Sequence, residues 1–207
     1  NEEQMEACLK LGFHRIYTPN LSLFKQNQIH DNVYYSLPRT LLQIEGELRP
    51  RSLVREICNF SNYDGLIGDY TLNIYNIYTA YYLYQLGLSK LTLSVELSSL
   101  EIIDFINRFE QAFGCKPNVE VINYGLVEDM VIKGNILNLK ENVYHYSLRD
   151  LRGRKFPVYY RDNRTILLNY VSFNLSEFLS LKDAVSLRYQ FFMETKDEII
   201  NIVKNNQ

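Results

Sequence analysis

The sequence predicts an α/β protein built mainly from parallel βαβ units, with a small antiparallel β-rich insertion near residues 143–170. Up to residue 142, short runs rich in β-branched and aromatic residues alternate with segments whose apolar residues recur at helical spacing. After residue 142, short β-type runs follow one another, linked by Gly153 and Asn163. Parallel strands need long crossover connections, whereas antiparallel strands do not. The pattern before residue 142 therefore favours βαβ units, and the pattern after it favours hairpins.

Five short strands are expected in the first part of the chain. Pro19 and Pro38 each follow an apolar run and end it, because proline lacks the N–H group that a strand ladder requires. Glycine or polar residues bound the other runs. The five strands are expected at residues 13–18, 33–37, 65–67, 91–95 and 119–123.

Helices are expected between these strands. Residues 73–86 have an apolar stripe and are followed by Gly87, a typical helix stop. Another helix is expected from Ser52 onward, and a short one precedes the first strand and ends near Gly12. The apolar residues that predict these last two helices are Leu53, Val54, Ile57 and Phe60, and Met5, Cys8 and Leu9.

Two capping boxes mark later helices. In Ser98-x-x-Glu101 and in Thr195-x-x-Glu198, the hydroxyl and the carboxylate can each accept a backbone N–H at the start of a helix. The first helix should end at Gly114. Its inner face is expected to carry Ile102, Ile103, Ile106, Phe109 and Phe113, and that of the last helix Ile199, Ile200 and Val203. The remaining strands are expected at residues 143–146, 156–160, 166–170 and 184–191.

The composition is that of an ordinary globular domain. The chain has 207 residues, 46% hydrophobic and 22% charged, so we expect a single domain over residues 1–207, with 1–142 and 171–207 forming the β/α part. Cys8, Cys58 and Cys115 form no C-x-x-C pair, which favours a reducing cytoplasm over a disulfide framework. We expect no membrane partner, because no apolar run approaches the roughly 18 residues that span a bilayer. The chain begins without a signal peptide or an initiator Met, so we expect a piece of a longer protein.

Positive charge is concentrated in one region. The net charge is −2, yet residues 149–164 hold six basic and two acidic residues, a local +4 that leaves −6 elsewhere. Such a region can bind the phosphates of an RNA or an acidic peptide, although solvated charge on a hairpin is the commoner explanation. Arg149, Arg152 and Arg154 are therefore the candidate substrate-binding arginines.

An ordered series of short motifs resembles the collagenase-like peptidase family U-thirty-two over about residues 9 to 204. The series comprises Leu37-Pro38-Arg39, Gly68-Asp69-Tyr70-x-Leu72-Asn73-x-x-Asn76, Leu86-Gly87, Leu93-Ser94-x-Glu96-Leu97, Glu120, Gly125, Met130, Tyr146-Ser147-Leu148-Arg149-Asp150, Gly153, Phe156-Pro157, Arg188 and Glu194. The resemblance implies a TIM-like (β/α) barrel, of which this chain is similar to the later part. A partial barrel leaves sheet edges open. Either residues upstream close the barrel in the full protein, or the fragment packs differently.

The resemblance also bears on cofactors. Some members of that family are reported as collagen-degrading peptidases, and others hydroxylate RNA or quinone precursors with an iron–sulfur cluster held by four cysteines. Such clusters need thiolate ligands. The first two cysteine positions are Glu128 and Asn135 here, and the later ones fall near Tyr144 or His145 and near Asn163. We therefore expect no cofactor.

Two acids are candidates for catalysis. Glu96 is expected at the carboxyl end of one strand and Glu120 inside another. In a TIM-like barrel the carboxyl ends of strands face the active site, where a buried Glu can serve as general acid or base. The alternative is that both accept backbone N–H groups and anchor loops. Asn73 is a candidate substrate contact, or else it fixes the start of a helix.

Other chemistry finds little support. Glu128, Asp129 and His145 are acceptable metal ligands but have no tight spacing, so we expect no metal site. The sequence has no G-x-S-x-G, H-E-x-x-H or P-loop motif. Two hypotheses follow. The chain is part of a peptidase that resembles family U-thirty-two, or it is a non-catalytic or RNA-binding module related to the hydroxylating branch.

Overall fold

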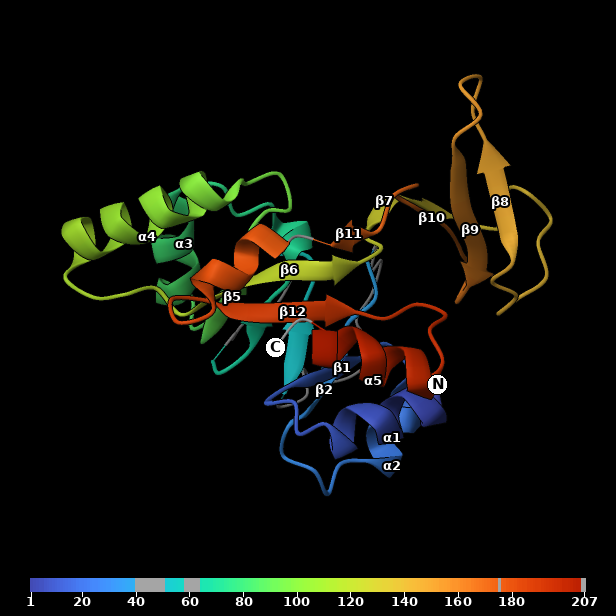
Figure 1. The fold of residues 1–207 in the computed structure, drawn as a ribbon, viewed down its shortest axis with the longest axis horizontal. Helices are drawn as coiled ribbons and strands as arrows, with labels where there is room; N and C mark the ends of the chain where they lie inside the picture. Colours follow the sequence, from blue (N-terminus) through green and yellow to red (C-terminus); the bar gives the residue numbers. More distant parts are fainter. Residues whose placement is uncertain (40–50, 58–63, 175, 206–207) are drawn as a thin grey trace.

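The computed structural model describes residues 1–39, 51–57, 64–174 and 176–205. They form a curled, mainly parallel sheet with helices outside it, and a separate antiparallel sheet at one end (Figure 1). Within the described residues, no helix is both long enough and apolar enough to cross a membrane.

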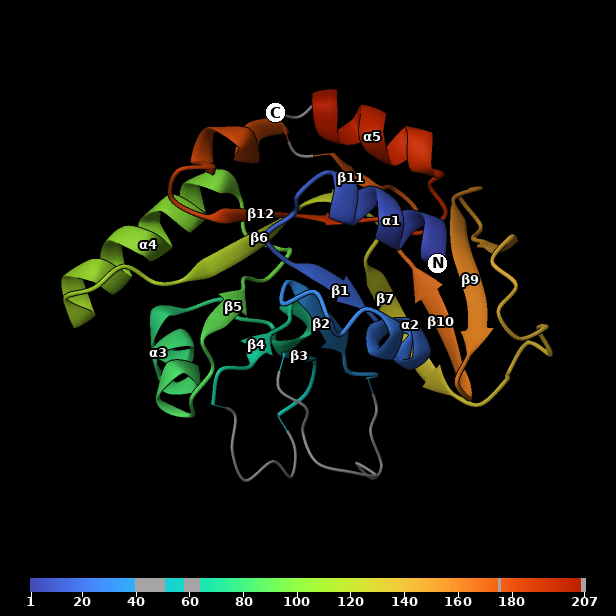
Figure 2. The ribbon, with the colours of Figure 1, turned by 90° about the horizontal axis from the view of Figure 1, so that it is seen from below.

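Seven parallel strands make the curled sheet, which we call the half-barrel. The hydrogen-bonded order is β1-β2-β3-β4-β5-β6, with β12 parallel to β6 on its other side and the short antiparallel β11 also on β6. Figure 2 shows the curl. The strands are β1 (Ile16–Thr18), β2 (Val33–Ser36), β3 (Ser52–Val54), β4 (Ile67–Gly68), β5 (Lys90–Thr92), β6 (Val119–Gly125), β11 (Phe173–Asn174) and β12 (Ser186–Gln190).

The helices cover the outer face of the half-barrel. α3 and α4 pack together with η2 over β5 and β6, where Leu91 and Val121 meet Phe105 and Phe109 (Figure 1). A smaller core lies under α1 and α2 and contains Met5, Leu23, Phe24 and Val33. The helices are α1 (Glu2–Lys10), α2 (Leu21–Gln26), α3 (Ile77–Gln85), α4 (Ser99–Phe113) and α5 (Lys196–Asn205), with the 3₁₀ segments η1 (Tyr70–Leu72) and η2 (Ser176–Leu181).

The antiparallel sheet has the order β7-β10-β9-β8. One of its faces packs against the half-barrel through an apolar cluster around Tyr159, Ile166 and Leu168, to which Leu126 and Phe192 contribute. Its strands are β7 (Glu128–Lys133), β8 (Tyr146–Arg149), β9 (Lys155–Arg161) and β10 (Arg164–Leu168).

The fold confirms the α/β class, the parallel units and the added antiparallel sheet. That sheet begins earlier than predicted, because β7 starts at Glu128 within a stretch that shows no strand rhythm. A TIM-like barrel is not confirmed, since the ladder of the described residues runs from β1 to β12 without closing.

Individual elements agree unevenly with the predictions. The capping box of Ser98 and Glu101 is present, and α4 ends at Gly114. The prediction that Ile103 faces the core is wrong, because its side chain is 41% exposed, and Phe105, which was not predicted there, is buried instead. The helix predicted from Ser52 is wrong at its start, where residues 52–54 form the buried strand β3. Its last part, with Cys58 and Phe60, lies outside the described residues.

Candidate functional site

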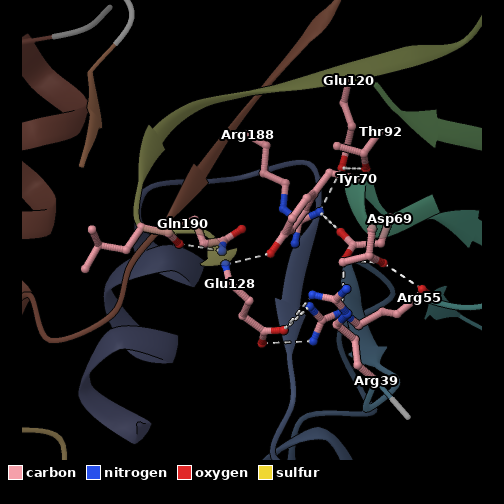
Figure 3. Close-up of polar contacts among 11 residues, drawn as sticks. Arg39, Arg55, Asp69, Tyr70, Thr92, Glu120, Glu128, Arg188 and Gln190 are labelled. Atoms are coloured by element: carbon pink, nitrogen blue, oxygen red, sulfur yellow. Dashed lines mark hydrogen bonds and ion pairs between the residues drawn. The ribbon is translucent and has the colours of Figure 1, made fainter. Parts of the chain in front are cut away.

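Charged side chains fill the inside of the half-barrel. Parallel partners lie on the same face of a sheet, and side chains alternate between faces along each strand. Thr92 pairs with Glu120, and Glu120 with Ser186. Their neighbours Leu91 and Val119 belong to the outer core. Thr92, Glu120 and Arg188 therefore share the concave face (Figure 3).

Five of these residues form what we call the inner charge cluster: Arg55, Asp69, Glu120, Glu128 and Arg188. Arg55 follows β3, Asp69 follows β4, Glu120 and Arg188 lie on β6 and β12, and Glu128 opens β7. The cluster thus joins four strands of the half-barrel to the antiparallel sheet (Figure 3).

Asp69 lies at the centre of the inner charge cluster and is fully buried. Arg55 Nε donates to its Oδ2 at 2.9 Å, and Arg188 Nη1 donates to its Oδ1 at 2.6 Å. Burial alone would raise the pKa of Asp69, but the two guanidinium groups outweigh it and hold the pKa below its usual value. Asp69 therefore stays ionised at neutral pH, where it fixes two arginines, and it is poorly suited to proton transfer.

The carboxylate of Glu120 also has hydrogen-bond and ion-pair partners. The Tyr17 hydroxyl and the Thr92 hydroxyl each donate to its carboxylate at 2.9 Å, and Arg188 lies 3.5 Å away. Glu120 is 3% exposed. Burial, and then the charge of Glu120, raise the pKa of Tyr17. The Arg188 guanidinium also lies 4.7 Å from the centre of the Tyr17 ring.

Glu128 connects the two sheets. Its carboxylate accepts two hydrogen bonds from Arg55, at 3.1 and 2.8 Å, and Arg39 lies 3.8 Å away. Its backbone N–H donates to the hydroxyl of the buried Tyr70. Because Arg55 bonds both Asp69 and Glu128, one guanidinium spans the junction between the half-barrel and β7.

A cleft opens beside Glu128, between the ends of β2 and β3 and the antiparallel sheet. It is partly open to solvent. Four arginines and two acids contribute to its lining, a difference of +2: Arg39, Arg55, Arg161 and Arg164, against Glu128 and Asp162. Arg161 Nε is buried and makes no hydrogen bond, although it lies 3.6 Å from Asp162 Oδ2.

The predicted catalytic acids lie in different surroundings. Glu120 belongs to the inner charge cluster, as described above. Glu96 follows β5 and is exposed, and its charge acts on Tyr75, itself bonded to Glu101 at the start of α4. Among the described residues, no hydrogen bond or shared partner joins Glu96 to Glu120.

Asn73 and the hairpin arginines lie outside the inner charge cluster. Asn73 ends η1 with a φ of 50°, and its Oδ1 accepts from the Ser94 hydroxyl. Its neighbour Asn76 caps α3 through Tyr78 and Thr79. Arg149, Arg152 and Arg154 lie around the turn that joins β8 to β9, and Arg154 pairs with Asp150 at 2.6 Å.

Glu128 and Asn135, which the resemblance aligns with cysteine positions, hold oxygen and nitrogen atoms that local partners use. Glu128 binds Arg55, and the side-chain amide of Asn135 exchanges hydrogen bonds with the backbone of Leu139. Oxygen and amide donors of this kind do not suit an iron–sulfur cluster. Within the part of the chain that the structure describes, no group of three His, Cys, Asp or Glu side chains converges on a metal position.

Sequence reasoning missed most of the inner charge cluster. Arg55, Asp69 and Arg188 were not candidate site residues, although Asp69 and Arg188 belong to the family-like motifs. A usable signal was present for two of them, because Arg55 directly follows Leu53-Val54 and Asp69 directly follows Ile67-Gly68. A charge at the end of a short buried strand marks the carboxyl edge of a parallel sheet, where sites form.

Comparison with known proteins gave no further guide. No protein-family model matches the chain. No curated protein and no solved structure matches it significantly.

Proposed function

We propose that this chain binds an anionic group of a substrate in the cleft between the half-barrel and the antiparallel sheet. The observation that carries the proposal is the arginine-rich lining, four guanidinium groups against two carboxylates, with Arg161 Nε buried and lacking a hydrogen bond. A carboxylate or phosphate oxygen would supply the missing acceptor. Guanidinium groups bind such oxyanions in planar, often bidentate geometry.

The inner charge cluster supports a binding role more than a catalytic one. Asp69 is held between two arginines, and Glu120 by two hydroxyl groups and Arg188. A general base needs an accessible carboxylate whose pKa lies near the working pH. These acids instead position Arg55 and Arg188, and the cluster contributes Arg55 and Glu128 to the lining of the cleft.

Titration with two small anions tests the proposal. Inorganic phosphate and succinate would be added to the protein, with calorimetry and the melting temperature as readouts. Arg161→Gln should weaken the preferred anion at least about tenfold, because hydrogen bonds to charged groups contribute about 1.5–3 kcal/mol. Arg108→Gln, which changes an exposed arginine of α4, is the matched control.

Each outcome of this titration is informative. Preference for succinate would identify a carboxylate ligand, and preference for phosphate a phosphorylated one. Equal binding by wild type and Arg161→Gln, or no stabilisation by either anion at low ionic strength, would contradict the proposal.

We further propose that the half-barrel is the later part of a TIM-like barrel similar to that of family U-thirty-two. The ordered motif series supports this, as does the arrangement of seven parallel strands with helices on the outer face. A strand from another segment would then pair with β1 or β12, neither of which pairs with a further strand on its outer side among the described residues. Protection of edge amides in β1 from hydrogen exchange, seen in a longer form of the protein and not in this chain, would support this assignment. Equal exchange in both would contradict it.

A peptidase is the second candidate function, and the resemblance to family U-thirty-two supports it. Glu120 is buried on the concave face, and the resemblance implies hydrolysis of collagen-like peptides. Under this candidate, Glu120→Gln would abolish cleavage of gelatin while the circular dichroism spectrum stays unchanged. Glu96→Gln would test the other predicted acid in the same assay. Cleavage that persists in both variants would rule out both acids.

A further inference from the structure

We propose that the free edge of β8 binds an extended acidic segment of a partner protein, which adds to the antiparallel sheet as a fifth strand. This surface is separate from the cleft, and the inference does not depend on the proposed function. Four observations carry it: the position of β8, the direction of its backbone groups, the charge around it and its exposed apolar side chain.

β8 is an edge strand. It pairs with β9 on one side and lies at the end of the order β7-β10-β9-β8. In Figure 1 it stands at the end of the molecule opposite α4. Its last three residues, Ser147, Leu148 and Arg149, are exposed.

The hairpin geometry determines which backbone groups of β8 face outward. The Asp150 N–H donates to the Arg154 carbonyl at 3.1 Å, so these two residues form a hydrogen-bonded pair. In an antiparallel ladder such pairs alternate with pairs that are not hydrogen-bonded. Leu148 opposite Phe156 is therefore bonded to β9, whereas Ser147 and Arg149 direct their N–H and C=O groups away from β9.

The residue opposite Ser147 agrees with this assignment. It is Pro157, which has no N–H to donate, and a position without ladder bonds to β8 accommodates it. In this register, the backbone N–H and C=O groups of Ser147 and Arg149 point away from β9. An added strand would pair with these two residues.

The surroundings of the edge are basic. Arg149 lies opposite Lys155 on one face of the hairpin, and Arg152 is exposed in the turn. The acid within the turn, Asp150, is occupied by Arg154 and by the N–H groups of residues 152 and 154. An acidic segment complements this charge, whereas a second copy of β8 would bring Arg149 toward another Arg149.

Side chains alternate between the two faces of the hairpin, and this indicates which residue types should alternate in the bound segment. Arg149 and Lys155 share one face, and Leu148 shares the other face with Phe156. Leu148 is 41% exposed. Side chains of the added strand alternate in the same way. The preferred segment therefore alternates acidic with apolar residues.

The binding test uses a synthetic peptide that alternates Glu with Val, and its lysine counterpart as a control. NMR amide exchange is the main readout. On binding of the Glu peptide, the amides of Ser147 and Arg149 should become protected at least tenfold, while the Leu148 amide, already bonded to β9, should change little. Affinity should also fall as salt is added.

Two variants separate the contribution of the backbone hydrogen bonds to peptide binding from the contribution of the charge. Ser147→Pro removes an outward N–H without removing a bond to β9, and it should abolish the protection of Arg149. Arg149→Glu should weaken the Glu peptide at least tenfold and strengthen the Lys peptide. Arg108→Glu on α4 is the control for net charge and should have little effect.

Three results would overturn the inference. The first is peptide binding that leaves the Ser147 and Arg149 amides unprotected. The second is binding of a single-stranded RNA in preference to the peptide, which would assign the basic hairpin to nucleic acid. The third is no binding of the Glu peptide at low salt, which would mean that Arg149 protects the edge from pairing, as charges on edge strands commonly do.

Discussion

Lys90 is a buried cation on the concave face, near the amino ends of the strands. Its Nζ donates to the Ser186 hydroxyl at 2.8 Å, and Arg15 Nη2 donates to the same oxygen at 3.4 Å. Burial first, and then the charge of Arg15, lower the pKa of Lys90 to about 8, against a partial offset from Glu120. Protonated Lys90 therefore destabilises the fold.

The pH dependence of this effect has a definite sign. The pKa of an unfolded lysine is about 10.4, so between pH 8 and about 10.4 the unfolded chain holds more protons and folding is favoured as the pH rises. Lys90→Met should have a larger free energy of unfolding than wild type at pH 7. This difference in free energy should become smaller as the pH rises from 8 to 10. Urea unfolding at several pH values measures this, and a gap that does not depend on pH would contradict it.

Asp69 should be the residue whose loss destabilises the fold most. Asp69→Asn leaves Arg55 and Arg188 buried without their shared anion, and breaking a buried pair from one side costs about 3–5 kcal/mol. Chemical denaturation measures the free energy of unfolding. Asp104→Asn, which breaks an exposed ion pair with Arg108, is the control and should change little.

The acid limb of the same experiment tests the protonation of Asp69. The lowered pKa of Asp69 means that its stabilisation is present above the unfolded value of about 3.9 and is lost as the pH falls toward the folded value. The difference between wild type and Asp69→Asn should therefore shrink below about pH 4. A loss under about 1 kcal/mol at pH 7 would show that the arginine pairs only offset the burial of Asp69.

At the scale of the element, helices with caps were predictable and very short strands were not. α4 has a capping box, a glycine stop and four buried apolar residues at helical spacing, and each signal is local. β3 has three residues, all buried, so it shows no alternation, and Leu53, Val54 and Ile57 happen to fit helical spacing. β7 lacks a clear pattern because its adjacent residues Asp129 and Met130, whose side chains point to opposite faces, are both exposed.

The ladder between β6 and β12 depends on Gly125. Its φ is +111°, and a Cβ there would overlap the backbone carbonyl of Gln190. Gly125→Ala should cost about 2–5 kcal/mol, the sum of backbone strain and overpacking. Gly134 has a φ of +89° with open space around it, so Gly134→Ala should cost only about 1–2 kcal/mol from strain. Thermal unfolding compares the two, and equal losses would contradict the role of the carbonyl contact.

At the scale of the whole molecule, the site depends on contacts between distant parts of the chain. Arg55 and Glu128 are 73 positions apart, and Asp69 and Arg188 are 119 apart. Local patterns place Glu120 on a strand, but they carry no information on which charges meet inside the curl. The sequence therefore predicted one member of the inner charge cluster as a site residue, and the pairing of the others required the strand order.

The junction between the two sheets should be a unit of local stability. The bidentate contact between Arg55 and Glu128 is buried, and apolar packing around Phe192 accompanies it. Glu128→Gln keeps the shape of the side chain but replaces one acceptor oxygen with an NH2 group. One hydrogen bond from Arg55 is then lost and the other no longer has a charged acceptor, at a cost of about 1.5–3 kcal/mol. Amides of β7 and β10 should then exchange at least about tenfold faster, while those of β5 and α4 remain unchanged.

A neighbouring substitution provides the control for this last prediction. Asp129 follows Glu128 on β7 and is exposed, so Asp129→Asn should leave exchange in both sheets as in wild type. Hydrogen exchange followed by mass spectrometry resolves the two regions. If Glu128→Gln accelerates exchange in α4 and β5 as much as in β7 and β10, the two sheets unfold together. The junction would then stabilise the whole molecule and would not act as a local connection.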